Sequence, residues 1–380
     1  MVRSSHVSRI GIILLTTLGA GVLAAPAQAA TTGVVSVAKS TQVQYKAGSG
    51  KASTVVVTRS GKTVTIDDKY KIKAGKGCKQ VKGDKTKVRC KLKKNPTRVL
   101  VHAGDKNDKV TNKTGIPSLF DGGTGNDSLW GGSKADKLYG GTGNDYLSGG
   151  AGNDALYGQA GNDTGYGKAG HDKIYGGGGN DRLHGDSGYY GDTGNDKIYG
   201  EGGNDSLIGW RGNDYLSGGA GNDGLEGDLD GDNYNTSGNG ADTLLGGSGV
   251  DTVRYDTYGT VRVDLDGQKG DDGRAGERDT VGADVENIVA GDSNGSVLIG
   301  NTANNVITSG EGADKIYGLG GNDTLDGSWG KDELHGGDGD DTLIGVDHGS
   351  QEIDADKLDG GANTDTCKAS TIDIVVNCEK

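Results

Sequence analysis

Gly122–Trp130 reads GGTGNDSLW, and the next nine residues, Gly131–Tyr139, read GGSKADKLY. The pattern continues as GGTGNDYLS, GGAGNDALY, GQAGNDTGY, GKAGHDKIY and GGGGNDRLH, which ends at His184. After interruptions it returns several times, as in GGDGDDTLI at 336–344, and after a further insertion as GGANTDTCK at 360–368. A short period repeated this often is the signature of a solenoid, in which each unit packs against its neighbours. The sequence therefore predicts an all-β repeat architecture.

The nine places have distinct physical roles. Glycine at the first, second and fourth places allows positive φ and hence tight turns. Leu or Ile at the eighth place stands between outward-facing residues, a spacing that suits a short strand with one face inward. The sixth place is almost always Asp. Each unit is therefore expected to be a turn followed by a short strand.

Stacking such units places the aspartates in columns, where like charges repel. A divalent cation with oxygen ligands answers this repulsion, since Asp carboxylates and turn carbonyls are the ligands that calcium prefers. Histidine and cysteine, the ligands of zinc and copper, are nearly absent from the repeats. The pattern therefore favours calcium.

The nonapeptide resembles G-G-x-G-x-D-x-U-x, the repeat of the RTX, or haemolysin-type, calcium-binding proteins. This resemblance implies a right-handed parallel β-roll, or β-solenoid, in which two nonapeptides make one coil. It also implies multiple Ca²⁺ ions between neighbouring turns, held by turn carbonyls and sixth-place aspartates. In this chain those aspartates are Asp127, Asp136, Asp145, Asp154, Asp163, Asp172, Asp181, Asp196, Asp205, Asp214, Asp223, Asp251, Asp314, Asp323, Asp332 and Asp341. The chain departs from the pattern at Ser296 and Asn305, which replace Asp, and at Gly165, which replaces an inward Leu.

Composition excludes other architectures. The chain has 75 glycines but only 3 prolines in 380 residues, and the glycines do not recur every third residue, which excludes collagen. A hydrophobic content of 32% excludes a single large core. The net charge of −13 conceals two halves, because 18 Lys and 3 Arg against five Asp give residues 31–114 a net charge of +16. Residues 115–380 are correspondingly acidic, at −31.

The N-terminus has the pattern of an export signal. Arg3 and Arg9 precede an apolar run, Ile10–Ala25, and the A-x-A sequence Ala27–Ala29 follows. This order is typical of a secretory signal peptide, which we expect to cover residues 1–29 and to be removed. A membrane anchor is the alternative, but the run is shorter than the roughly 20 residues that span a bilayer. The sequence thus predicts a secreted, extracellular protein with no transmembrane segment after signal removal.

The four cysteines fit an oxidising compartment. Cys78 lies close to Cys90 in the sequence, and Cys367 lies close to Cys378. Local pairing is the simplest of the three possible connectivities. No zinc-site spacing is present, so disulfides are favoured over a structural zinc.

These patterns divide the chain into segments. After the signal peptide we expect a basic, β-rich region at 30–114, with Cys78 and Cys90, that caps the solenoid. The first roll block is predicted at 115–254 and the second at 291–366, with an irregular β spacer at 255–290 between them; a catalytic insert is the alternative for the spacer. Residues 367–380, with Cys367 and Cys378, are predicted to form a C-terminal cap.

The sequence predicts a non-enzymatic calcium-binding protein whose roll folds outside the cell. One alternative is an adhesin-like module that binds an anionic polymer of the cell envelope through the basic region. Few aromatic residues accompany its lysines, so no nucleic-acid partner is expected. Another alternative is an extracellular hydrolase or lyase with an unrecognised site. Gly291–Gly295 fits G-x-S-x-G, but a strand rather than the required helix is expected after it.

Overall fold

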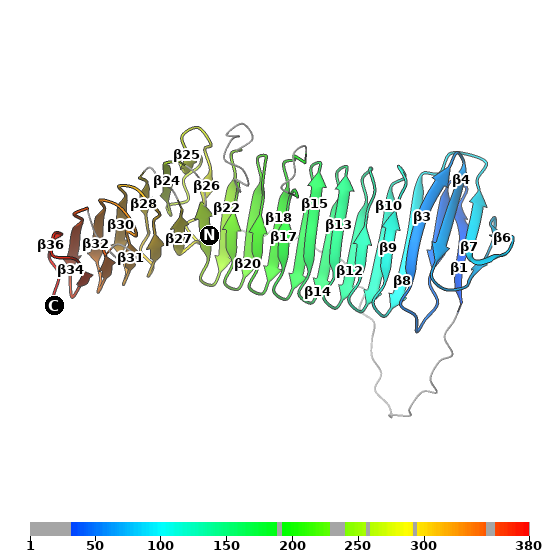
Figure 1. Cartoon of the computed structure of the whole chain (residues 1–380), viewed down its shortest axis with the longest axis horizontal. Coiled ribbons are helices and arrows are strands. Elements are labelled where there is room, and N and C mark those ends of the chain that lie inside the picture. Colours follow the sequence, from blue (N-terminus) through cyan, green and yellow to red (C-terminus); the bar gives the residue numbers. More distant parts are fainter. Residues whose placement is uncertain are drawn as a thin grey trace, which may run out of the picture.

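The computed structural model describes residues 32–187, 192–228, 240–255, 259–291, 295–346 and 354–379. These residues form strands and no helix, and the strands stack into the elongated rod of Figure 1. The predicted signal peptide, 1–29, lies outside the described residues. Within the described ranges, no helix has the length and apolar character needed to cross a bilayer.

One coil of the rod contains two strands that belong to different sheets. Strand β12 (Lys137–Thr142) pairs in parallel with β10 (Ser118–Thr124) and β14 (Ala155–Ala160). Strand β13 (Tyr146–Ala151), from the next nonapeptide, pairs in parallel with its own neighbours in the opposite sheet. Two nonapeptides therefore make one coil, and the fold is the predicted parallel β-roll.

The remaining strands of the rod fall into three sheets. The first sheet continues through β8 (Arg98–Asp105), β16 (Lys173–Gly178), β18 (Lys197–Gly202), β20 (Tyr215–Ala220), β22 (Thr243–Ser248) and β26 (Thr280–Val281). The second sheet contains β9 (Lys109–Asn112), β11 (Ser128–Trp130), β15 (Thr164–Ala169), β17 (Arg182–His184), β19 (Ser206–Ile208), β21 (Gly224–Glu226), β23 (Thr252–Tyr255), β27 (Asn287–Ala290), β29 (Val306–Thr308), β31 (Thr324–Asp326), β33 (Thr342–Ile344) and β35 (Thr366–Lys368). The third sheet contains β24 (Val261–Asp264), β25 (Gly273–Arg274), β28 (Val297–Ile299), β30 (Lys315–Gly320), β32 (Glu333–Asp338), β34 (Lys357–Ala362) and β36 (Ile374–Val376).

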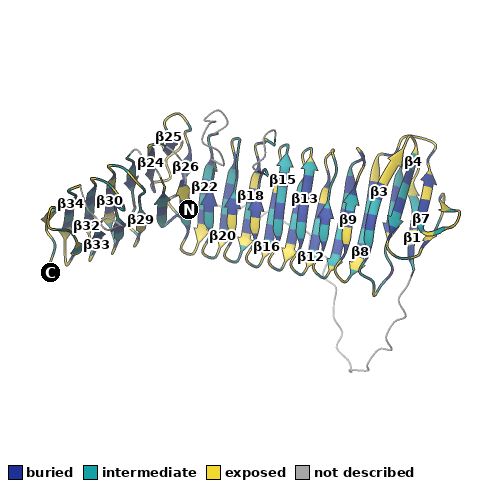
Figure 2. Ribbon diagram, viewed as in Figure 1, coloured by how far each residue is buried: buried dark blue, intermediate teal, exposed yellow. Residues whose placement is uncertain are grey.

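The core is a column of eighth-place side chains between the sheets. Leu138 pairs in register with Leu156, and Leu156 with Ile174, and all three are buried. Figure 2 shows the resulting alternation of buried and more exposed residues along the strands. At Gly165 the missing side chain leaves little space, because a Cβ there would lie 3.2 Å from Ile174 Cγ2 and 3.3 Å from Leu183 Cδ2. Neighbouring coils therefore fill this gap in the pattern.

The basic region closes the N-terminal end of the rod. Its further strands are β1 (Gly33–Lys39), β2 (Gln42–Lys46), β3 (Thr54–Ser60), β4 (Thr63–Asp68), β5 (Ile72–Ala74), β6 (Lys79–Val81) and β7 (Asp84–Lys91). Strand β2 stacks on β8, and β3 stacks on β9, so both sheets of the roll continue into this region. The pairs β1–β2, β3–β4 and β4–β7 are antiparallel. This region is therefore a β cap, and a disulfide joins its Cys78 to Cys90.

The spacer continues the solenoid irregularly. Strand β27 pairs with β23 on one side and with β29 on the other, so the second sheet runs unbroken through both blocks. On the opposite face the first sheet ends at β26, and the third sheet begins with β24, which pairs with β28. One wall of the roll is thus continuous, and the other is interrupted at the spacer.

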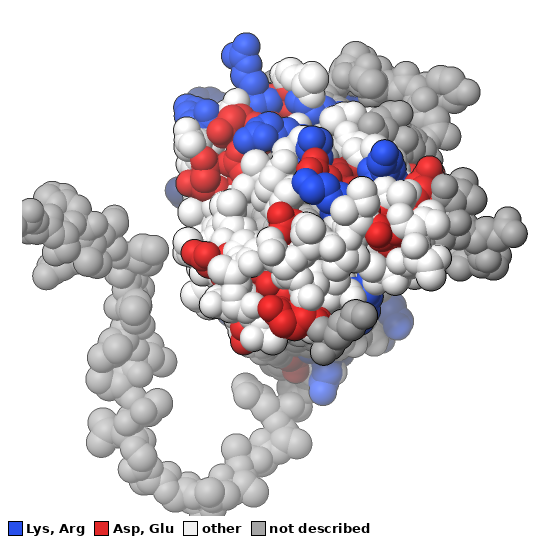
Figure 3. Space-filling model, turned by 90° about the vertical axis from the view of Figure 1, so that its left-hand side faces the viewer, with Lys and Arg blue, Asp and Glu red and all other residues white. Residues whose placement is uncertain are grey.

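At the C-terminal end, β36 pairs with β34, and a disulfide joins Cys367 to Cys378. Both local disulfides expected from the sequence are therefore present. Figure 3 looks onto this end, where Lys and Arg side chains gather mostly in the upper part and Asp and Glu side chains are scattered over the face. Ile374, at 61% exposure, is among the apolar residues that β36 leaves open to solvent.

Candidate metal centre

The turns of the roll bring successive backbones very close together. Gly143, at the fourth place, has a φ of 119°, and a Cβ at this residue would overlap the Gly125 carbonyl oxygen of the preceding coil. At the second place the left-handed conformation persists even where glycine is replaced, since Gln159 and Lys168 have φ values of 81° and 74°. The stacking of turns therefore imposes this backbone shape, and glycine adopts it without strain.

The sixth-place aspartates form hydrogen-bonded ladders along the rod. The N–H of Asp145 donates to Oδ1 of Asp163 at 2.7 Å, and the N–H of Asp163 donates to Oδ1 of Asp181 at 2.7 Å. Equivalent bonds connect the aspartates of the other coils, across 18 residues in regular coils and across 24 or 28 where an insertion intervenes. One oxygen of each carboxylate is thus committed to the next backbone.

The second carboxylate oxygen, Oδ2, is in most coils buried and without a hydrogen-bond partner. This state is shared by Asp127, Asp145, Asp154, Asp163, Asp172, Asp181, Asp196, Asp205, Asp214, Asp223, Asp242, Asp251, Asp323, Asp341 and Asp365. Asp136 differs, since its Oδ2 accepts the N–H of Gly132 at 2.6 Å. Buried polar atoms in proteins are normally partnered, so a regular array of unpartnered carboxylate oxygens indicates positions suited to bind a cation.

Carbonyl oxygens lie beside these free carboxylate oxygens. A Cβ placed on Gly176 would overlap Oδ2 of Asp181 and lie 2.8 Å from the carbonyl oxygen of Gly200, in the next coil. The absence of a side chain at the first-place glycine therefore leaves a cradle between a carboxylate oxygen and a carbonyl oxygen. Hard oxygen donors of both kinds are what Ca²⁺ binds, so the residues present fit this ion.

All sixteen predicted ligands lie in these turns, in columns along the rod. Those of the first block that precede second-sheet strands are Asp127, Asp145, Asp163, Asp181, Asp205, Asp223 and Asp251. Those that precede first-sheet strands are Asp136, Asp154, Asp172, Asp196 and Asp214. In the second block, Asp314 and Asp332 lie in one column, and Asp323 and Asp341 lie in the other.

The structure adds acids to these columns that were not predicted. Asp279 and Glu286, both from the spacer, accept the N–H groups of Asp242 and Asp251 at 2.9 and 2.8 Å. Asp365 accepts the N–H of Asp341 at 2.9 Å. Its place was visible in the sequence, because it is sixth in GGANTDTCK, whereas the spacer offers no such period.

Asn305 and Ser296, which replace Asp at the sixth place, make different contacts from the aspartates beside them. Asn305 donates to the Glu286 carbonyl oxygen at 2.6 Å and accepts the N–H of Asn301 at 2.8 Å, so its amide is satisfied within the chain. The N–H of Ser296 continues the ladder by donating to Oδ1 of Asp314 at 2.5 Å. The ladder therefore persists at these positions without contributing a carboxylate.

A second ladder was missed at the sequence level. At the fifth place, the N–H of Asn144 donates to Oδ1 of Asn126 at 3.1 Å, and the N–H of Asn162 donates to Oδ1 of Asn144 at 3.0 Å. These bonds run in the opposite direction to those of the aspartates and lie at the exposed rim of the turns. In the sequence, this asparagine ladder is indicated by the Asn that precedes the sixth-place Asp in most repeats.

Burial strongly disfavours the charged form of the column aspartates. It raises the pKa of Asp163 from 3.8 to about 7, and the charges of Asp145 and Asp181 add to the effect. It raises the pKa of Asp172 to about 9, with added repulsion from Asp196 and Asp154. Without a cation, these carboxylates are therefore poorly tolerated in the folded roll at neutral pH.

Protonation of the buried aspartates at low pH is accordingly expected to stabilise the calcium-free roll in part, as bound calcium does. Asp163 titrates near 3.8 when unfolded and near 7 in the calcium-free fold, so between these values the fold holds a proton that the unfolded chain has released. The free energy of unfolding then falls as the pH rises through this window. Circular dichroism of the calcium-free protein should show more sheet at pH 5 than at pH 8. A sheet signal that does not change between these pH values would contradict this expectation.

Comparison with protein families gives a match to the repeats. The family model for the RTX calcium-binding nonapeptide repeat (4 copies) matches residues 121–156, 157–189, 190–225, 229–256, 290–325, 299–334 and 326–345. No curated protein matches the chain. The matched segments include all the turns in which the predicted aspartates lie.

Proposed function

Because the chain belongs to the RTX family of calcium-binding nonapeptide-repeat proteins, we propose that it is a secreted, non-enzymatic protein whose roll folds on binding Ca²⁺ outside the cell. The observation that carries this proposal is the array of buried, unpartnered Oδ2 atoms along the turns. A fold that buries so many carboxylates requires compensating positive charge. Calcium binding therefore becomes part of folding itself.

The proposed ligands are the sixth-place aspartates and the carbonyl oxygens of the first-place glycines. Bound Ca²⁺ supplies positive charge between adjacent coils. The chain itself holds each carboxylate in place through the Oδ1 ladder and leaves space for the ion at glycines such as Gly176. Because the turns order only when the ion binds, part of the binding free energy is spent on folding the roll.

Three features support secretion. The predicted signal peptide at 1–29 would direct the chain to an export route. Two disulfides suit an oxidising compartment. Extracellular modules commonly bind calcium at a Kd of about 10⁻⁴–10⁻³ M, so such a roll would stay unfolded inside the cell and fold outside.

The proposal of a non-enzymatic role rests on where the perturbed acids lie. Carboxyls with strongly raised pKa values, such as Asp163 and Asp172, are repeated along the turn columns. Such repetition is suited to binding many ions and not to a single reaction centre. A screen of the purified protein on polysaccharide, lipid and peptide substrates would reveal a hydrolase or lyase activity.

A second candidate function uses the basic cap. Hairpin β6–β7 and its flanks carry exposed lysines, including Lys76, Lys79, Lys82 and Lys85. A cluster of this kind attracts anionic polymers, as an adhesin-like module on the cell envelope would require. Binding to envelope polymers should then weaken with salt and disappear when residues 30–114 are deleted.

Expression of the full-length chain in a bacterial host tests the main proposal. The form in the medium should begin near residue 30 and resist trypsin in millimolar calcium. The precursor retained in the cytoplasm should keep residues 1–29 and be digested. Adding EDTA to the exported form should make it sensitive as well. An exported form that resists trypsin equally with calcium and with EDTA would refute calcium-dependent folding.

A further inference from the structure

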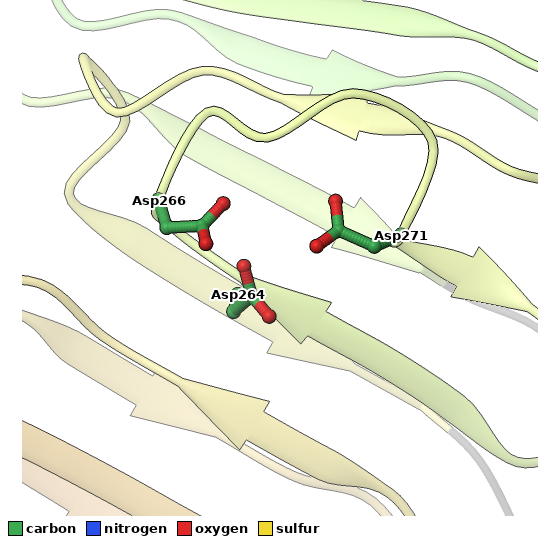
Figure 4. Close-up of side chains that lie close together, drawn as sticks. All are labelled: Asp264, Asp266 and Asp271. Carbon is green, nitrogen blue, oxygen red and sulfur yellow. The ribbon is translucent and has the colours of Figure 1, made fainter.

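Three acidic side chains outside the nonapeptide turns converge at the spacer. Asp264 ends strand β24, and Asp266 and Asp271 lie in the loop between β24 and β25. One carboxylate oxygen of each lies within 4.8 Å of the others. Figure 4 shows Asp266 and Asp271 on the two arms of the loop, facing each other, with Asp264 on the strand beneath them. This geometry brings three negative charges to one point.

Asp264 is the buried member of this cluster. Its exposure is only 6%, and its Oδ1 has no hydrogen-bond partner, whereas its Oδ2 accepts a hydrogen bond from Arg262 at 2.9 Å. A buried carboxylate oxygen without a donor is costly unless a cation contacts it. This unsatisfied oxygen, beside two further carboxylates, points to a metal ligand.

The other two acids have the positions that an ion site needs. The carboxylate of Asp266 is oriented by Gln268, whose N–H donates to its Oδ1 at 2.7 Å and whose side-chain amide donates to its Oδ2. Asp271 is exposed, so water can complete the coordination of a bound ion from that side. Ca²⁺ accepts six to eight oxygen ligands and tolerates such mixed shells.

The loop also lies where the wall of the roll changes from one sheet to another. Oδ1 of Asp272 accepts the N–H of Asp264 at 2.7 Å, and Oδ2 of Asp272 accepts the N–H of Val281 at 2.8 Å. Asp264 belongs to β24 of the third sheet, and Val281 belongs to β26 of the first sheet. The Asp272 carboxylate therefore ties the two sheets together directly beside the acidic cluster.

We propose that Asp264, Asp266 and Asp271 form a Ca²⁺ site, separate from the nonapeptide turns, that fastens the junction between the two roll blocks. The ion neutralises the convergent carboxylates and holds the two arms of the 264–272 loop together. Because the ligands come from the end of β24 and the loop that follows it, and not from the nonapeptide turns, this site fills independently of the ladders in the turns. The proposal thus goes beyond the calcium binding of the repeats.

Trypsin cleavage after Lys269 tests the proposal, because Lys269 is exposed within this loop. The full mature chain is compared with Asp271→Asn, and with Asp338→Asn as a matched control, since Asp338 is also exposed but lies at the end of β32. In saturating calcium, all three proteins should show the same sheet spectrum by circular dichroism. Cleavage after Lys269 should be roughly tenfold faster in Asp271→Asn, because an unfastened loop opens more often.

Equilibrium dialysis against radioactive calcium gives the second readout. Asp271→Asn should bind one ion fewer per chain than the other two proteins. The proposal requires both results, so unchanged cleavage or an unchanged ion count in Asp271→Asn overturns it. Loss of the whole sheet in that variant also overturns it, since a local site cannot hold the entire roll. Equal protection of Lys269 by magnesium alone overturns the assignment to calcium. None of these outcomes depends on whether the chain is secreted.

Discussion

Removing calcium with EDTA is expected to unfold residues 122–365 while leaving the N-terminal cap, residues 33–105, folded. The roll buries an aspartate in nearly every turn, and burial raises the pKa of Asp163 to about 7, so the ionised column is unstable without a cation. Free calcium at ten times its Kd adds about 1.4 kcal/mol per site, and ten sites add about 14 kcal/mol. This sum equals or exceeds the total stability of most domains, about 5–15 kcal/mol.

The cap should survive because its stability has another source. Its buried residues are largely apolar, among them Val35, Val57 and Ile66, and the Cys78–Cys90 disulfide closes a loop within it. A bridge across about a dozen residues stabilises a fold by roughly 3 kcal/mol. Calcium is therefore not needed to hold this region together.

Hydrogen exchange followed by mass spectrometry distinguishes the two regions within one sample. In EDTA, protection should vanish from the roll peptides and remain in the cap peptides, and calcium should restore it where magnesium does not. Uniform protection throughout the chain in EDTA would show that the ladders alone hold the turns. Loss of protection in the cap as well would show that its folding depends on the stacked roll.

Substitution of one glycine in a cradle is expected to have the second-largest effect. In Gly176→Ala, the new methyl group would overlap Oδ2 of Asp181 and lie 2.8 Å from the Gly200 carbonyl oxygen, so it would occupy the space proposed for the ion. Forcing a methyl group into a close-packed site typically costs about 1–3 kcal/mol, and the lost ion adds to this. We expect a loss of roughly 3 kcal/mol in the free energy of unfolding in calcium.

Gly178→Ala is the matched control, because Gly178 lies on the same strand, β16, and a Cβ there meets no atom within 4 Å. Neither glycine has a positive φ, so backbone strain does not separate the two variants. Urea unfolding in calcium should place Gly178→Ala within about 0.5 kcal/mol of the parent protein. Ion counting should show fewer bound ions in Gly176→Ala alone. Equal stability and equal ion counts in both variants would disprove the cradle at Gly176.

The regular part of the roll could be predicted because every coil repeats the same local information. Leu138, Leu156 and Ile174 occupy the eighth place, and the structure buries all three between the sheets. The calcium-binding character could be predicted for the same reason, since one Asp in each turn becomes a column when the turns stack. At Gly165, where the inward Leu is replaced, Ile174 and Leu183 pack into the space and preserve the fold. The sequence of a single repeat does not indicate this packing.

The spacer could be predicted only in outline. Its β character and its continuation of the solenoid were expected, but its contribution to the columns was not. Asp279 accepts the N–H of Asp242 across 37 residues, and Glu286 accepts the N–H of Asp251 across 35. No fixed interval in the sequence indicates such partners, so only the path of the folded chain selects them.

The amino-acid sequence by itself determined the repeating unit, the inward column of Leu and Ile, and the affinity of the turns for calcium, whereas the coil of two nonapeptides followed from the resemblance to the RTX repeat. Each of these depends on contacts between neighbours at a constant spacing, which a period encodes directly. Tertiary structure alone decided which carboxylate oxygen serves the backbone ladder and which stays free. It also decided that one wall of the roll is continuous and that Asp264, Asp266 and Asp271 meet where the other is interrupted. These outcomes depend on the conformation of a loop that does not follow the repeat, and that conformation is set by packing against the rest of the folded chain.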